Sequence, residues 1–227
     1  MTNPSFQVAL DGPAASGKST VARMLAKQIG GYYINTGDMY RTLAWHAIFL
    51  GIRPDAEPEK VVAMLKDCVL QYRVIDGTPQ LFLNDQPVPQ SAIRAPEIAA
   101  NASVVARIPA LREWMLQAQR DCASLGIIIM EGRDIATVIF PQARFKFFVT
   151  ASPLERARRR LAQSGEVPEG ATLESVAESI RQRDLADSSR PVAPLKPAPD
   201  SILIQTDGLT AEEVTQKLAD TIHAALA

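Results

Sequence analysis

The sequence predicts an α/β protein with a five-stranded parallel sheet flanked by helices. Two observations lead to this fold class. Short apolar segments alternate with longer segments of helical periodicity, and one glycine-rich loop joins the first strand to the first helix. The 227 residues are 47% hydrophobic and 22% charged, which is enough apolar material for one sizeable core and an inserted subdomain.

The predicted strands are short and rich in β-branched, aliphatic or aromatic residues, as buried parallel strands require. They are Phe6–Leu10, Tyr32–Asn35, Ile127–Met130, Phe145–Val149 and Ile202–Gln205. Helical patterns lie between and after them, at Ser19–Ile29, Gly37–Leu50, Pro109–Leu125, Pro153–Gln163 and, with Thr210 as its N-cap, Ala211–Leu226. The dense prolines of 190–199 exclude a helix and predict an extended connector into the last strand.

The alternation breaks between Cys68 and Gln90. Residues Val69–Val74 and Gln80–Asn84 alternate with period two, and the Asp76-Gly77 pair between them is typical of a hairpin turn. We expect a small antiparallel sheet inserted in the core. Such an insert either covers a second substrate or has no ligand role.

The glycine-rich loop fits the phosphate-binding pattern G-x-x-x-x-G-K-[ST]. Its glycines let backbone N–H groups turn toward phosphate oxygens, and the helix that follows adds its partial positive charge. Lys18 can reach the β- and γ-phosphates of a nucleoside triphosphate, and the Ser19 hydroxyl can ligate Mg²⁺. The loop consists of Gly12, Pro13, Ala14, Ala15, Ser16, Gly17, Lys18 and Ser19.

Charged residues also follow the second and third predicted strands. Thr36 and Arg41 could bind a phosphate, or could be a helix N-cap and a solvated arginine. Glu131 ends an apolar strand, an arrangement that holds Mg²⁺ directly or through water. Arg133 and Asp134 could face the same crevice, or could form an internal ion pair.

Two further charge clusters follow the fourth predicted strand. Either could be a solvated helix face, or an arginine-bearing lid that stabilises charge on a transferring phosphoryl group and excludes water. The members are Arg156, Arg158, Arg159 and Arg160 in the first cluster and Arg181, Arg183, Asp184, Asp187 and Arg190 in the second.

Composition narrows the range of partners and locations. A net charge of −1 gives no argument for a nucleic-acid polymer or a membrane surface as a partner. Two distant cysteines, Cys68 and Cys122, form neither a disulfide framework nor a zinc site. With no visible signal peptide and no apolar run of about 20 residues, we expect a cytoplasmic protein. Nothing in the sequence demands more than a monomer.

In these motifs the chain resembles the bacterial cytidylate kinases, a branch of the nucleoside monophosphate kinase family. The resemblance runs from Val8 to the final helix. The Gly-Arg-Asp-Ile and Ala-Pro-Leu segments discriminate this family best, because many families share the phosphate loop. The matching segments are Asp11-Gly12-Pro13, Thr36-Gly37-x-Met39-Tyr40-Arg41, Ile93-Arg94, Gly132-Arg133-Asp134-Ile135 and Arg190-x-x-Ala193-Pro194-Leu195.

The resemblance implies a P-loop kinase core at 1–60 and 109–227, a monophosphate-binding insert at about 61–108 and a lid at about 153–190. It implies transfer of the γ-phosphoryl group of ATP to CMP or dCMP, with Mg²⁺. The segment Gly12–Thr20 would hold ATP, and Ser19 and Glu131 would hold the metal. The residues implied at the acceptor nucleotide are Thr36, Arg41, Ser103, Arg112, Arg133, Asp134, Arg183 and Asp187, and those implied in catalysis are Lys18, Arg133, Arg158 and Arg190.

Three residues depart from the family's pattern. Asn35 and Glu131 stand where aspartate is usual, and Asp38 stands where a small residue is usual. These departures affect the expected metal geometry rather than the reaction. Two other interpretations stay open: a UMP/CMP, adenylate or shikimate kinase on the same core, or a nucleotide-binding switch that transfers nothing.

Overall fold

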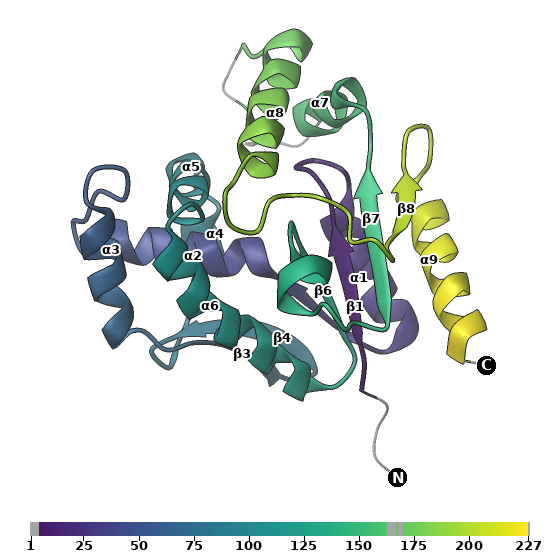
Figure 1. Ribbon diagram of the computed structural model, residues 1–227, viewed down its shortest axis with the longest axis horizontal. Helices are drawn as coiled ribbons and strands as arrows, with labels where there is room; N and C mark the ends of the chain where they lie inside the picture. Colours follow the sequence, from purple (N-terminus) through teal and green to yellow (C-terminus); the bar gives the residue numbers. More distant parts are fainter. Residues whose placement is uncertain (1–4, 163–166, 168–169, 227) are drawn as a thin grey trace. The chain divides into compact units, whose positions relative to one another are not determined.

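The computed structural model describes residues 5–162, 167 and 170–226. It contains the expected five-stranded parallel sheet (Figure 1), with the strand order β2-β6-β1-β7-β8. The central strand β1 pairs in register with both neighbours, so that Ala9 lies opposite Met130 on one side and opposite Lys146 on the other. The strand bounds are β1 Gln7–Asp11, β2 Tyr32–Asn35, β6 Ile128–Gly132, β7 Phe145–Thr150 and β8 Ile202–Gln205.

The chain divides into two compact units. The first comprises Met1–Tyr33 and Gly126–Ala227, and the second comprises Ile34–Leu125. The second unit contains the whole of the segment 61–108 that was expected to bind a monophosphate, whose role stays a prediction. Each unit has a hydrophobic core of its own.

In the first unit, helices α1 (Lys18–Ile29) and α9 (Ala211–Leu226) pack together against the sheet. Their apolar faces bury Leu25 and Leu218 against strand residues such as Phe147, all of them fully buried. Burial of this kind contributes roughly 1.5–3 kcal/mol for each large aliphatic side chain. The helix predicted at about Ala211–Leu226 is confirmed, and Thr210 caps it by accepting from the Glu213 N–H at 3.2 Å.

Helices α7 (Pro153–Leu161) and α8 (Leu173–Ser188) follow β7 and pack side by side (Figure 1). A small apolar cluster joins them, centred on Ala157 and Ile180. Ser152 caps α7 by accepting from the Glu155 N–H at 3.3 Å. The predicted end of α7 at Gln163 lies outside the described residues. The proline-rich segment 190–199 has no helix or strand, as its composition predicts.

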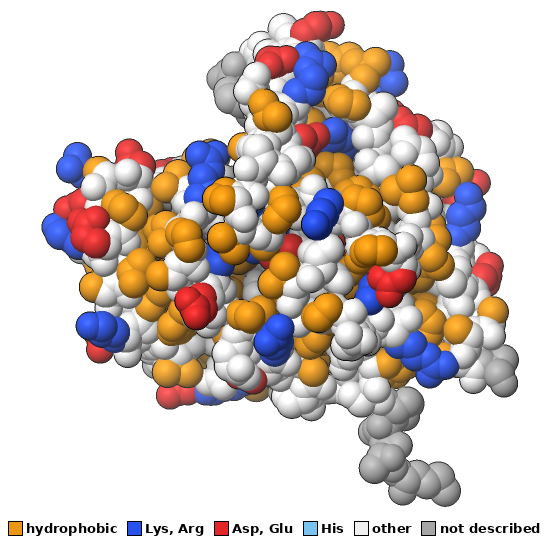
Figure 2. Space-filling view, in the orientation of Figure 1, with side chains coloured by type: hydrophobic (Ala, Val, Ile, Leu, Met, Phe, Trp, Pro, Cys, Tyr) orange, Lys and Arg blue, Asp and Glu red, His pale blue; other side chains and the backbone are white. Residues whose placement is uncertain are grey.

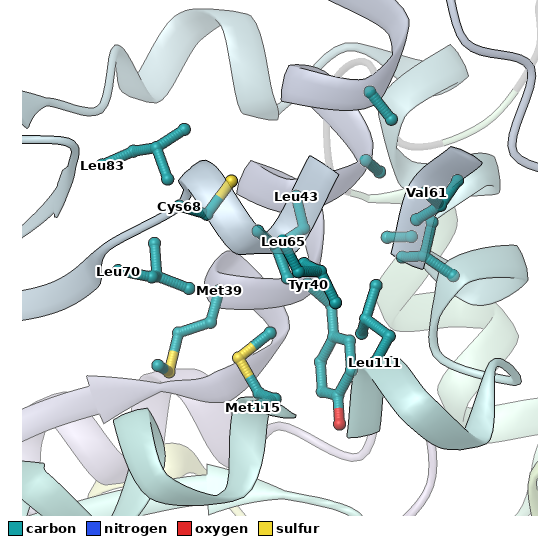
Figure 3. Close-up of a cluster of buried hydrophobic side chains, with 14 of the residues drawn as sticks. Met39, Tyr40, Leu43, Val61, Leu65, Cys68, Leu70, Leu83, Leu111 and Met115 are labelled. Carbon is teal, nitrogen blue, oxygen red and sulfur yellow. The ribbon is translucent and has the colours of Figure 1, made fainter. Parts of the chain in front are cut away.

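The second unit consists mostly of helices, with one small sheet. A cluster of buried side chains fills its interior (Figure 3), and Met39, Leu43, Leu111 and Met115 are fully buried there. The helices that enclose this cluster, with two short 3₁₀ turns at Leu65–Asp67 and Cys122–Leu125, are α2 Thr36–Phe49, α3 Pro58–Met64, α4 Gln90–Ile93, α5 Pro96–Val105 and α6 Pro109–Asp121.

The predicted hairpin is present as β3 (Leu70–Ile75) and β4 (Thr78–Leu83), which pair antiparallel. Asp76 and Gly77 have φ values of 50° and 75°, as the turn prediction requires. A third strand, β5 (Gln86–Pro87), completes the sheet. It is too short to have been recognised from a period-two pattern.

One prediction in this unit was wrong in detail. Ser103 and Arg112 lie in α5 and α6, and only a short turn separates these helices. Proline at the first position of both helices marks their starts. The helix predicted over Pro109–Leu125 ends at Asp121 and continues as a 3₁₀ turn.

Among the described residues, no helix combines the length and the apolar character that crossing a membrane requires.

Gly12 is the most tightly constrained glycine of the first unit. A β-carbon at this position would lie 2.0 Å from the backbone oxygen of Val149, and the φ of Gly12 is 148°. Any side chain would therefore push β7 away from the end of β1. The first residue of the phosphate loop is thus a glycine for steric reasons as well as for phosphate access.

We expect Gly12→Ala to lower the free energy of unfolding by at least about 2–3 kcal/mol, because backbone must move to admit the methyl group. Urea denaturation measures the change. Gly30→Ala is the matched control, since Gly30 also has a positive φ (67°) but has no atom within 4 Å of its added β-carbon. Equal losses in the two variants would contradict the steric explanation.

Candidate active site

The phosphate loop leads into α1 through a helix start that carries no side-chain cap. Gly17 occupies the N-cap position with a φ of 90°, and no side chain hydrogen-bonds the first turn there. The first N–H groups of a helix have no partner within the helix, so they can bind an anion. Ala15 also has a positive φ (59°), which is uncommon for alanine. The loop therefore has the open, amide-rich form that the motif predicts.

Lys18 lies inside this loop rather than in solvent. Its Nζ donates to the Pro13 carbonyl at 2.6 Å and to the Ser16 hydroxyl at 3.2 Å, and its side chain is buried. Burial and, as a smaller cause, the positive charge of Arg133 together lower the pKa of Lys18 to about 7, although the Glu131 carboxylate opposes the shift. An anionic phosphate near Nζ would favour the charged ammonium form.

Two arginines of α7 hold the loop from outside. Arg156 donates to the Ala14 carbonyl at 3.2 Å and to Asp184 at 2.5 Å, and Arg159 donates to the Ser16 carbonyl at 3.3 Å. The sequence placed both residues in a charge cluster without giving either a role. Their spacing of three residues, which puts them on one helix face, is the signal that could have singled them out.

Arg158 points elsewhere. Its side chain is 60% exposed and lies 3.7 Å from Glu155 on the same helix. Its neighbours on α7 thus contact the loop, whereas Arg158 faces solvent.

Asp11 fixes the segment that follows β6. Its carboxylate accepts from the N–H groups of Ile135 at 2.8 Å and Ala136 at 2.7 Å, at the start of a single π-helical turn, Ile135–Ile139. Burial raises the pKa of Asp11 to about 6, and the two hydrogen bonds oppose that rise. The end of β1 is thereby tied to the residues just after Arg133 and Asp134. Sequence reasoning quoted Asp11 as part of a motif but did not predict this contact.

Asp187 lies between two of the predicted arginines, Arg133 and Arg190. It accepts from Arg133 Nε at 2.9 Å and lies 3.5 Å from Arg190 Nη2. Burial alone would raise the pKa of Asp187, but Arg133, Arg190 and Arg183 outweigh it and hold that pKa below its ordinary value of 3.8. Arg133 therefore shares one electrostatic cluster with three predicted residues from a distant part of the sequence, Arg183, Asp187 and Arg190.

We expect Asp187→Asn to destabilise the fold at pH 7 by about 1–3 kcal/mol, because the arginines would then repel one another without a carboxylate between them. The contribution of a carboxylate with a lowered pKa is complete above pH 3.8 and is lost as the pH falls through the folded-state pKa. Denaturation of wild type and variant from pH 7 to pH 3 measures this. Asp220→Asn, a change at an exposed position of α9, is the control. A difference that persisted at acid pH would contradict the assignment.

In the second unit, α2 carries two of the predicted residues. Thr36 is buried at the first position of the helix, and Arg41 donates to the Ile93 carbonyl at 3.3 Å. The cap is Asn35 rather than Thr36, since the Asn35 side chain accepts from the Asp38 N–H at 3.3 Å. Asp38 is itself buried and accepts from Arg94 at 2.6 Å.

The other two predicted residues of this unit lie on α5 and α6. Arg112 is buried, donates to the Ala106 carbonyl at 3.3 Å and has its guanidinium carbon 5.6 Å from the centre of the Tyr40 ring. Ser103 is half-buried on α5. The unit thus brings Tyr40 and Arg112 together. It also places Arg41 and Arg94 at the C-terminal end of α4.

Ser19 and Glu131, the two residues expected to hold a metal, offer one hydroxyl and one carboxylate. Glu131 is buried at the end of β6 and accepts a hydrogen bond from Tyr33, to which Ser19 is also hydrogen-bonded. Among the described residues, no three His, Cys, Asp or Glu side chains gather into a metal-binding group. Mg²⁺ is usually bound by one or two carboxylates together with substrate phosphates and water. One carboxylate and one hydroxyl therefore fit this ion.

Comparison with known proteins decides the family. The family model described as cytidylate kinase matches residues 8–224. The chain belongs to the cytidylate kinase family. It is similar to "Cytidylate kinase" of Bacillus cereus (strain ATCC 10987 / NRS 248), with 39% identity over 98% of each chain. It is also similar to "Cytidylate kinase" of Limosilactobacillus reuteri (strain DSM 20016), with 41% identity over 96% of this chain and 95% of that protein.

Membership of the cytidylate kinase family makes the chain a phosphotransferase, with ATP as the phosphoryl donor that such a kinase uses. The interpretation as a switch that transfers nothing is not favoured. Among solved structures, shikimate kinase from Bacteroides thetaiotaomicron shares the fold, with a TM-score of 0.50, 15% identity and coverage of 96% of this chain and 98% of that one. That likeness concerns the fold alone.

Proposed function

We propose that this protein transfers the γ-phosphoryl group of ATP to CMP or dCMP, giving ADP and the diphosphate. The observation that carries the proposal is the cationic cluster of the first unit. Arg133 and Arg190 both contact Asp187, and, beside burial, the positive charge of Arg133 is near enough to lower the pKa of Lys18. Binding a triphosphate requires the loop and its lysine, whereas transfer also requires cations for the charge that spreads over the moving phosphoryl group.

On the donor side, Gly12–Thr20 bind the ATP phosphates through backbone N–H groups and Lys18. Arg133 and Arg190 are the best supported cationic groups for the transition state, because Asp187 already orients both of them. Arg158 acts there only if it turns from solvent toward the phosphates. Arg156 and Arg159 keep the loop in shape through its carbonyls.

On the acceptor side, Arg41 binds the phosphate of the monophosphate and Thr36 binds beside it. Ser103, Arg112 and Asp134 read the cytosine base, and Arg183 and Asp187 bind near the sugar. The amino group of cytosine can donate a hydrogen bond to the Asp134 carboxylate, whereas uracil has a carbonyl oxygen at the same ring position. This difference disfavours UMP by placing two acceptors against each other.

Mg²⁺ belongs to the proposal, with Ser19 and Glu131 as its protein ligands. When bound, the ion neutralises charge on the β- and γ-phosphates of ATP. Glu131 supplies the negative charge from the end of β6, and Ser19 supplies a neutral oxygen from the first turn of α1.

The proposed partners are small molecules only. Positive and negative side chains are interspersed on the face shown in Figure 2, and no extended basic surface of the kind that binds a nucleic-acid polymer is visible on that face. We propose a monomer in the cytoplasm. Cys68 and Cys122 are both buried as free thiols, which suits a reducing compartment.

The proposal is tested by ADP release from ATP and Mg²⁺ with a panel of acceptors: CMP, dCMP, UMP, AMP, shikimate and none. We expect strong turnover with CMP and dCMP, weak turnover with UMP and none with the others. Lys18→Ala serves as the inactive control, with a loss of about 10²–10³-fold or more. A rate that is the same with every acceptor would refute the proposal, and strong turnover with UMP or shikimate would favour the corresponding kinase.

We expect Asp134→Asn to reduce the ratio of kcat/KM for CMP to kcat/KM for UMP by about 10–100-fold. The reason is that the new amide can donate a hydrogen bond to the uracil carbonyl, which the carboxylate repels. The ratio of kcat/KM values for the two acceptors measures the change. Glu59→Gln, an exposed change on α3, is a control for altered charge. An unchanged ratio in Asp134→Asn would reject the base-reading role.

A further inference from the structure

Asp11 holds the chain after β6 at two separate places. Its backbone lies opposite Gly132, the last residue of β6, in the parallel pairing of β1 with β6. Its carboxylate accepts from the N–H groups of Ile135 at 2.8 Å and Ala136 at 2.7 Å. Only residues 133–134 lie between these two places. A single residue of β1 therefore binds the chain on both sides of 133–134.

The hydrogen bond to Ile135 fixes the backbone of Asp134 itself. The Ile135 N–H belongs to the same planar peptide group as the Asp134 carbonyl. That carbonyl accepts from the N–H groups of Val138 at 2.9 Å and Ile139 at 3.3 Å. The peptide group is thus bound at both of its polar ends, which holds the ψ of Asp134 at 25°.

Asp11 also performs a task that an aspartate at position 134 could perform alone. Asp134 is the N-cap of the π-helical turn Ile135–Ile139, and an N-cap aspartate commonly accepts from the first N–H groups that follow it. In the part of the chain that the structure describes, the Asp134 side chain makes no such capping hydrogen bond. The Asp11 carboxylate caps the turn instead. The Asp134 carboxylate is therefore not committed to the turn that it precedes.

Water has little access to these hydrogen bonds. Asp11, Ile135 and Ala136 are all buried. A buried N–H group that loses its acceptor must find another partner or stay unpaired, and either outcome is unfavourable. Without the Asp11 carboxylate, the backbone after Asp134 would therefore have to shift.

We propose that Asp11 is a positioning residue for the choice of acceptor base: by binding the backbone on both sides of residues 133–134, it sets where the Asp134 carboxylate meets cytosine. The proposal rests on the base-reading role of Asp134 under the proposed function. Asp11 touches no substrate in this account. Because Gly12 follows it directly, Asp11 also places that carboxylate relative to the start of the phosphate loop.

Asp11→Asn tests this role. The amide has nearly the same size, but it offers one accepting oxygen, and its NH₂ group meets a backbone N–H. We expect the ratio of kcat/KM for CMP to kcat/KM for UMP to fall by about 10-fold, because misplacement by about 1 Å can cost that much or more. The dissociation constant of ATP, measured by calorimetry, should stay within about three-fold of the wild-type value. A loss of folded protein lowers the rate with both acceptors alike, so it leaves the ratio unchanged.

Asp207→Asn is the matched control. Asp207 also binds backbone with both carboxylate oxygens, which accept from the Ser152 N–H at 3.1 and 3.0 Å. The change of side chain is the same, but the contact lies at the start of α7 and not after β6. We expect the ratio of kcat/KM values for CMP and UMP to stay within about two-fold of the wild-type ratio.

Amide hydrogen exchange tests the contact itself. The Ile135 and Ala136 amides of the wild type should be strongly protected, as buried hydrogen-bonded groups are. In Asp11→Asn they should exchange about 10-fold faster or more, whereas the amide of Val8, a fully buried residue of β1, should not change. Unprotected amides in the wild type, or unchanged exchange in the variant, would overturn the proposal. If Asp11→Asn does not fold, Asp11→Ser replaces it, because a hydroxyl can accept one of the two hydrogen bonds.

A double variant shows whether Asp11 acts through Asp134. Asp134→Asn already removes the carboxylate, so adding Asp11→Asn should lower the ratio of kcat/KM values by less than about two-fold more. An unchanged ratio in Asp11→Asn alone overturns the proposal. An equal fall of the ratio with and without the Asp134 carboxylate overturns it as well, since Asp11 would then act by another route.

The proposed function can fail separately. If the wild type does not phosphorylate CMP, or if Asp134→Asn leaves the preference for CMP unchanged, the proposed site fails and this proposal falls with it. If the wild type phosphorylates CMP and Asp134→Asn reduces the preference, but Asp11→Asn preserves it, only the positioning role of Asp11 is lost.

Discussion

Buried charges at the carboxyl ends of β1 and β6 constrain much of the first unit. Lys18, Asp11 and Glu131 are all buried, and an isolated ionised group would be costly there. Each is matched by a partner: loop oxygens for Lys18, backbone N–H groups for Asp11 and the Tyr33 hydroxyl for Glu131. The surrounding elements must supply these partners at fixed positions. The phosphate loop, the π-helical turn and strand β2 are therefore tied together by electrostatics as well as by the apolar core.

The same logic extends to the helices that follow β7. Arg156 and Arg159 reach carbonyl oxygens of the phosphate loop, and Arg156 also pairs with Asp184 of α8. Asp187, three residues further along α8, accepts from Arg133, which directly follows β6. A movement of α7 or α8 would break contacts to the loop and to β6 together. The position of α7 and α8 and the shape of the phosphate loop are thus coupled through a small set of arginine contacts.

Much of this could be predicted from sequence because local patterns determine it. Strand Tyr32–Asn35, helix Ala211–Leu226 and the Asp76-Gly77 turn follow from periodicity and turn chemistry within a few residues. The contacts of Asp11 and Tyr33 could not be predicted, since their partners lie about 100 residues away. Charge clusters such as 156–160 show that arginines are concentrated but not which one turns inward. That choice depends on tertiary packing against the loop.

Each of the three residues expected to depart from the family's pattern has a hydrogen-bond partner. The side chain of Asn35 caps α2 by accepting from the N–H of Asp38, and the side chain of Asp38 pairs with Arg94. Glu131 accepts from Tyr33. Removing one member of a buried hydrogen-bonded pair costs more than replacing both, because the remaining group loses its partner. The departures are therefore best understood as members of pairs, and changing Asp38 to a small residue would remove the ion pair that Arg94 now makes.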